Sequence, residues 1–170
     1  MVNIVSGSLL YGIVIAAVTQ DLVRRKISNR LILAGLVIAL ICRIVQGGIR
    51  VVFPCLGNIV FPVVTLYLLY LAGILGAGDI KLFSVIGCFL KLKQLICCIV
   101  MSFAVGALLA LLWMVRYRTL FSGLQDGIRY IAELLQGNWH TYEGKEGGKE
   151  NRMHFSVAIL IGLVLTVCIV

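Results

Sequence analysis

Two acidic residues of the chain are set apart from the others. Five of the seven acids fall within the polar stretch 116–152, whereas Asp21 closes the first apolar run and Asp79 precedes the fourth. A carboxylate at the edge of an apolar run is costly unless it is solvated, paired or protonated. Two carboxyl groups that share one water form an acid–base pair, because their mutual repulsion keeps one protonated and the other ionised. The pattern therefore indicates acid–base hydrolysis that needs no cofactor.

Each residue around this pair also has a structural interpretation. Gly76 and Gly78 lack side chains, so they would let an extended substrate backbone approach Asp79. Alternatively, Asp79 caps the helix that follows it, and Asn29 caps the second helix in the same way. Asp21 taken alone would be an ordinary flanking charge.

Other chemistries have little support in the sequence. None of the six cysteines stands in a C-x-x-C pair, and His140 and His154 have no partner at metal-ligand spacing. No Ser/His/Asp or Cys/His signature suggests a nucleophile. No alternation of basic and stacking aromatic residues suggests a nucleic-acid partner. We therefore predict no metal and no cofactor.

The composition indicates an all-α polytopic membrane protein. Of 170 residues, 61% are hydrophobic and 13% charged, with a mean hydropathy of +1.08. A soluble domain of this length could not bury so much apolar surface. The apolar runs predict six transmembrane helices in a single integral-membrane domain, 1–170. They lie at about 2–20, 31–46, 51–75, 80–92, 94–115 and 155–170.

Three features qualify these spans. Residues 80–92 would give about 20 Å of helix against about 30 Å of hydrocarbon. Either Lys91 and Lys93 extend outward, or the Asp79 end lies in a water-filled notch. Arg43, near the end of its run, is expected to snorkel to the interface. Between spans five and six, the spacing of apolar residues from Leu120 predicts an amphipathic interfacial helix, followed by a mobile loop at 144–151.

Lysine and arginine set the orientation. Eleven lie in the first, third and fifth loops, and four lie on the opposite side. The excess predicts that the odd loops are cytoplasmic, that both termini are outside, and that Asp21 and Asp79 share the cytoplasmic face. The net charge of +8 then matches a lipid bilayer rather than a nucleic acid. Lys81 is most simply an anchor on this side, although it could also hold substrate or tune the carboxylates.

Two segments resemble a known family. They are Gly76-Ala77-Gly78-Asp79-Ile80-Lys81 and the stretch containing Asp21, Arg25, Ile27, Ser28 and Asn29. Together they resemble the type IV prepilin peptidases, which are bacterial GxGD membrane aspartyl proteases. In that family an Ile-Pro-Asn-like stretch follows the first aspartate, and here Ser28 replaces the proline. The last run, Met153-His154-Phe155-Ser156 leading to Gly162, is similar to the family's Pro-Phe-Ala-Pro…Gly segment without its prolines.

The resemblance implies a function for these residues. Asp21 and Asp79 would be the catalytic pair, and five residues would bind substrate or shape the site: Gly76, Gly78, Lys81, Arg25 and Asn29. The substrate would be a prepilin or pseudopilin of the Flp or tight-adherence kind, cut after its leader at the cytoplasmic face of the bacterial inner membrane. The similarity is to short members without the zinc-binding methyltransferase region, so we expect no methylation.

Three alternatives stay open. A presenilin-like protease would carry its aspartates on adjacent late spans, whereas here they fall on spans one and four. A small proton- or ion-coupled transporter subunit would use Asp21 and Asp79 to bind ions. A purely structural assembly subunit would need neither carboxylate.

Overall fold

The computed structural model describes residues 4–116 and 155–169, and within these ranges it is all helical with no strand. The helices are α1 (Ile4–Arg24), α2 (Asn29–Gly47), the short 3₁₀ helix η1 (Ile49–Val51), α3 (Val52–Leu71), α4 (Ala77–Phe89), α5 (Leu92–Arg116) and α7 (Phe155–Ile169). The predicted amphipathic helix beyond Arg116 and the predicted loop at 144–151 lie outside the described residues.

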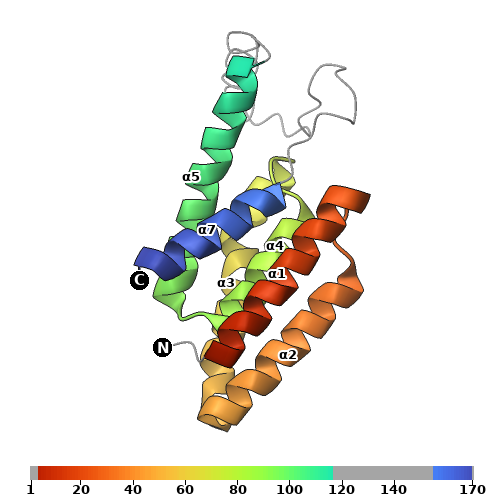
Figure 1. The fold of residues 1–170 in the computed structure, drawn as a ribbon. Helices are drawn as coiled ribbons and strands as arrows, with labels where there is room; N and C mark the ends of the chain where they lie inside the picture. The colour runs from red at the N-terminus through yellow and green to blue at the C-terminus, as the bar shows by residue number, and fades with distance from the viewer. Residues whose placement is uncertain (1–3, 117–154, 170) are drawn as a thin grey trace.

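Successive helices run up and down the bundle, and α7 crosses it obliquely (Figure 1). The start of α1 and the end of α7 lie at the same end. The end of α1, the start of α2, the start of α4 and the start of α7 lie toward the other end (Figure 1). The antiparallel order therefore brings together the chain segments that contain Asp21 and Asp79.

The short helix α4 is the centre of the bundle. Ile80 and every residue from Leu82 to Phe89 are buried, and α4 contacts α1, α2, α3 and α5. A helix that is apolar on all sides is stable only when it is surrounded, which explains this position. On one side, a Cβ at Gly87 would overlap the backbone carbonyl oxygen of Asn58, so α3 and α4 touch backbone to backbone.

The last helix packs on α5 through small residues. A Cβ at Gly162 would lie 2.7 Å from the backbone nitrogen of Ser102, so only glycine permits this approach. Phe155, the first residue of α7, stacks against Phe103 of α5 and Phe83 of α4, with ring centroids 5.3 and 6.5 Å apart. These contacts fix the start of α7 beside α4.

Among the described residues, four helical segments are long and apolar enough to cross a membrane: Ser6–Arg24, Asn29–Gly47, Ile49–Leu71 and Leu92–Trp113. Their outward faces expose large apolar side chains such as Val64, Leu68 and Val100. The chain is thus a multi-pass membrane protein of helical type. The count of six spans is not confirmed, because α4, with 13 residues, and α7, with 15, are shorter than such segments.

Candidate active site

The turn after α1 holds the first aspartate in place. α1 ends at Arg24, and Arg25 adopts a left-handed backbone with φ of 52°. Its N–H donates to the backbone carbonyl of Asp21 at 2.8 Å. Glycine is the usual residue in this conformation at the end of a helix, so Arg25 shapes the site through its backbone.

Ser28 closes the same turn and begins α2. Its backbone N–H donates to Oε1 of Gln20 at 3.1 Å, and its Oγ accepts from the N–H of Arg30 at 3.3 Å. Ser28 is therefore the N-cap of α2, and the interpretation of Asn29 as that cap is wrong. Its φ of −67° is one that proline could adopt, but proline would lack the N–H that bonds to Gln20.

Asn29 and Lys81 connect the first turns of α2 and α4. The ammonium group of Lys81 donates to Oδ1 of Asn29 at 2.9 Å. Both residues are exposed, and they lie 52 positions apart in the sequence. Lys81 therefore holds the start of α4 against α2, on the same turn of α4 as Asp79.

Asp79 lies inside the first turn of α4 rather than before it. The helix begins at Ala77 with Gly76 as N-cap, so the prediction that Asp79 itself caps the helix is wrong. The Gly76 N–H instead donates to the Asp79 carboxyl group, which reaches back over the turn. A Cβ at Gly76 would lie 3.0 Å from Oδ2 of Asp79, so this glycine makes room for the carboxyl group.

Gly78 has a different neighbour. A Cβ there would lie 3.4 Å from Cδ1 of Ile27, which belongs to the turn after α1. The two glycines of the Gly-Ala-Gly-Asp motif thus serve different contacts. Gly76 makes room for the carboxyl group, and Gly78 faces Ile27 in the turn that follows α1, the helix that carries Asp21.

The two carboxyl groups influence each other electrostatically. Burial raises the pKa of Asp79 and the negative charge of Asp21 raises it further, while the Gly76 N–H lowers it, giving a pKa of about 6. Asp79 lies outside the four candidate spans, in the first turn of α4. The structure therefore brings Asp21 and Asp79 together as a pair in which Asp79 holds a proton more readily than a free carboxyl group does.

A third residue, missed in the sequence, completes the site. Ser156, in the first turn of α7, is buried, and its hydroxyl donates to Oδ2 of Asp21 at 2.6 Å. This length is typical of a hydroxyl that donates to a carboxylate. Serine in an apolar helix is not distinctive by itself, so only the packing of α7 reveals the contact.

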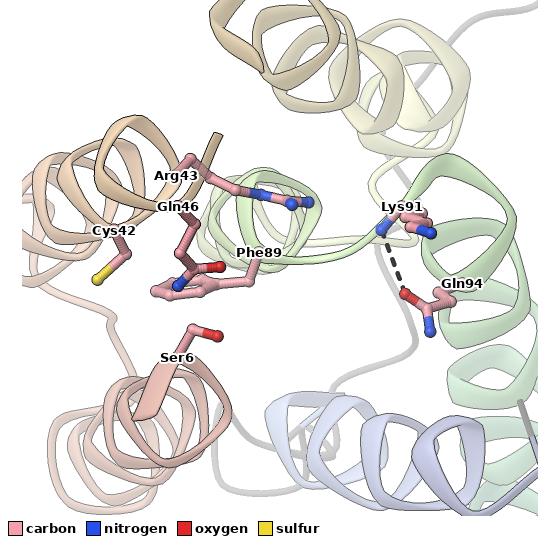
Figure 2. A pocket seen from close by; sticks show the side chains of 7 residues that line it. All are labelled: Ser6, Cys42, Arg43, Gln46, Phe89, Lys91 and Gln94. Atoms are coloured by element: carbon pink, nitrogen blue, oxygen red, sulfur yellow. Dashed lines mark hydrogen bonds between the residues drawn. The ribbon is translucent and has the colours of Figure 1, made fainter. Parts of the chain in front are cut away.

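A pocket formed by the described helices lies elsewhere. Its lining comes from the start of α1, the ends of α2 and α4, and the start of α5, including Ser6, Arg43, Phe89 and Gln94 (Figure 2). Asp21 and Asp79 are at the other end of α1 and α4. Within 4–116 and 155–169, no group of three or more His, Cys, Asp or Glu residues is placed to hold a metal ion.

Comparison with known proteins gives one match. The sequence matches the model of the type IV leader peptidase family over residues 8–111. The matched stretch includes Asp21, Asp79 and the turn between α1 and α2, and it ends before α7. No curated protein and no solved structure matches the chain.

Proposed function

The chain belongs to the type IV leader peptidase family, and from this premise we propose that it is a membrane aspartic endopeptidase with Asp21 and Asp79 as its catalytic pair. Its substrates would be prepilins or pseudopilins of the Flp or tight-adherence kind, from which it removes the leader. The observation that carries the proposal is the pair itself. Two carboxyl groups 58 positions apart in the sequence lie close enough for the charge of one to raise the pKa of the other.

The surroundings of the pair suggest different roles for its members. Ser156 donates to Oδ2 of Asp21, and a hydroxyl donor of this kind suits the ionised form of the Asp21 carboxyl group. Asp79, with a raised pKa, suits the protonated form. We assign Asp21 as general base and Asp79 as general acid.

Hydrolysis would then proceed in two steps. Asp21 takes a proton from the water as the water oxygen attacks the scissile carbonyl carbon, and Asp79 gives its proton to the carbonyl oxygen. In the second step the tetrahedral intermediate collapses as the C–N bond breaks. The proton on Asp21 passes to the leaving amine, and the hydroxyl proton of the intermediate returns to Asp79. Both carboxyl groups end in their starting state, so no cofactor is consumed.

The remaining predicted site residues would shape the approach to this pair. Gly76 is exposed beside the Asp79 carboxyl group and presents no side chain to an extended substrate. Lys81 and Asn29 join α4 to α2. Arg25 and Gly78 form the turn and its contact with α4.

We further propose that the pair faces the cytoplasm from the bacterial inner membrane, with both termini outside. The excess of basic residues in the odd loops supports this orientation. The start of α1 and the end of α7 lie at the end of the bundle opposite the pair (Figure 1). A leader junction at the inner surface would then meet the pair directly.

The test is co-expression with a candidate prepilin, scored by the gel shift of leader removal. Asp21→Asn and Asp79→Asn should each abolish processing while membrane insertion is retained. Glu146→Gln, a change of the same kind in the polar stretch, should process normally. Processing at near wild-type rate by either aspartate variant would exclude the pair as the catalytic groups. Ion uptake without any processing would favour the transporter interpretation, which the family match does not support.

A further inference from the structure

The C-terminal end of α4, which lies far from Asp79, ends inside the helical bundle. The helix has 13 residues and ends at Phe89, so at about 20 Å it is shorter than the roughly 30 Å of hydrocarbon. The last carbonyl groups of any helix lack N–H partners from the helix itself. Inside a bundle without water, such groups need partners from neighbouring helices.

Two side chains from neighbouring helices bond to backbone carbonyl groups at this end. Arg43 of α2 donates from Nε to the Cys88 carbonyl at 2.8 Å and from Nη2 to the Leu90 carbonyl at 3.1 Å. Asn58 of α3 donates from Nδ2 to the same Leu90 carbonyl at 3.0 Å. The thiol of Cys55 adds a weaker contact to the Cys88 carbonyl at 3.8 Å. We call Arg43 and Asn58 the C-terminal clamp of α4.

The position of Arg43 corrects a sequence-based expectation. We expected the side chain to snorkel toward the interface, but its guanidinium is partly buried and reaches over the end of α4 (Figure 2). A guanidinium can bond two carbonyl groups at once through its fixed fork of N–H groups. Its charge also suits the negative end of the helix dipole.

Asn58 holds α4 through its backbone as well. Its carbonyl group would normally accept from residue 62 of the same helix, but that residue is Pro62, which has no N–H. Gly87 of α4 packs directly against this carbonyl oxygen. Asn58 therefore contacts the α4 segment at two places: its side chain bonds to the Leu90 carbonyl, and its backbone carbonyl packs against Gly87. The two contacts together oppose sliding of α4 along α3.

We infer that Arg43 and Asn58 are positioning residues for Asp79, acting through the rigid length of α4. The inference rests on the proposed function and adds residues from the opposite end of the bundle. A slip of α4 by one residue would displace Asp79 by about 1.5 Å and rotate it by about 100°. Either movement would take its carboxyl group out of register with Asp21. At the other end, the exposed bond between Lys81 and Asn29 joins α4 to α2.

The test compares four purified variants with wild type: Arg43→Met, Arg43→Lys, Asn58→Leu and the control Arg50→Met. Arg50 is an exposed arginine in η1 near the same end of the bundle. Leader cleavage of a synthetic prepilin peptide gives kcat and KM. Arg43→Met should lower kcat about tenfold or more with little change in KM, because a catalytic group is misplaced while substrate binding is retained. Arg43→Lys and Asn58→Leu should lie between this variant and wild type, and Arg50→Met should equal wild type.

A second measurement does not depend on cleavage. Each variant is paired with the same variant carrying Asp79→Asn, and the thermal midpoints of the two are compared at about pH 4 and at about pH 7.5. In wild type the difference should depend on pH, because burial and Asp21 raise the pKa of Asp79. If the clamp positions Asp79, this pH-dependent difference should shrink in Arg43→Met and Asn58→Leu and persist in Arg50→Met.

The outcomes separate the two proposals. If wild type cleaves no leader, the proposed function fails, and the paired midpoints still decide the clamp. If the clamp variants keep the kcat of wild type, or lose stability equally at both pH values with the Asp79 difference intact, the positioning role is wrong. If Arg43→Met does not fold, Arg43→Lys and Asn58→Leu decide by the same criteria.

Discussion

Replacing Asp79 by asparagine should stabilise the protein near neutral pH. Burial and the charge of Asp21 raise the pKa of Asp79 from its ordinary value of 3.8 to about 6. The folded protein therefore holds this proton more tightly than the unfolded chain does. It follows that the Asp79 contribution to the free energy of unfolding is fully present below about pH 4 and is lost as the pH rises through about 6.

The size of the effect follows from the shift. One pKa unit corresponds to about 1.4 kcal/mol, so ionised Asp79 costs the folded state at most about 3 kcal/mol. Partial contact with solvent reduces this value. Asparagine has nearly the same shape and remains neutral, and its carbonyl oxygen could still accept from the Gly76 N–H that now bonds to Asp79. The variant should therefore avoid the cost and keep the contact.

Thermal unfolding of the detergent-purified protein measures this. Asp79→Asn should raise the midpoint by several degrees at about pH 7.5 and leave it nearly unchanged at about pH 4. Asp21→Asn removes one of the two causes that raise the pKa of Asp79. The increases in thermal midpoint from Asp21→Asn and Asp79→Asn should therefore not add in the double variant. The other charged side chains in this region are basic: Arg24, Arg25, Lys26, Arg30 and Lys81. A less stable Asp79→Asn at neutral pH, or an equal gain at both pH values, would refute the electrostatic argument.

Three further predictions concern the neighbours of the pair. Ser156→Ala should lower kcat about tenfold with KM nearly unchanged, because Asp21 loses its hydroxyl donor, while Ser156→Thr should retain most activity; equal kinetics for Ala and wild type would contradict the role. Gly76→Ala should lower kcat more than Gly78→Ala, because a Cβ at position 76 would lie 3.0 Å from a carboxyl oxygen of Asp79, whereas a Cβ at position 78 would lie 3.4 Å from a methyl group of Ile27. A lower kcat for Gly78→Ala than for Gly76→Ala would contradict this prediction. Ser28→Pro should lower stability by about 1 kcal/mol, since the backbone N–H that bonds to the end of α1 is lost; a raised thermal midpoint would show that the proline suits the turn better.

Local sequence patterns were sufficient to predict part of this molecule. The apolar runs overlap the helices, and the Gly-Ala-Gly-Asp motif with the charge-rich segment after the first run identified Asp21 and Asp79 as a candidate pair. The pattern placed the start of the fourth helix three residues too late, because Gly76 and Gly78 were interpreted as a break. In the structure the helix begins at Ala77, so Asp79 lies on its first turn.

Local sequence patterns could not predict contacts between helices that are far apart in the sequence. Arg43 was expected to reach for the interface because that is the best choice for one helix in lipid, but the end of α4 offers it two carbonyl groups. Ser156 lies in the segment that resembles the family's Pro-Phe-Ala-Pro stretch, but its bond to Asp21 depends on where α7 packs, which the sequence does not give. The count of six spans stays a prediction, since apolar character does not reveal that α4 is short and enclosed by other helices.

The contact between Ser156 and Asp21 has a consequence for biosynthesis. The hydroxyl comes from a helix made 135 residues after the carboxylate it serves. During translation, α1 to α5 enter the bilayer with both acids present but without this donor. Full activity should appear only once α7 has docked on α5 through the Gly162 contact. The order of synthesis would thus keep a half-built protease from cutting neighbouring nascent chains.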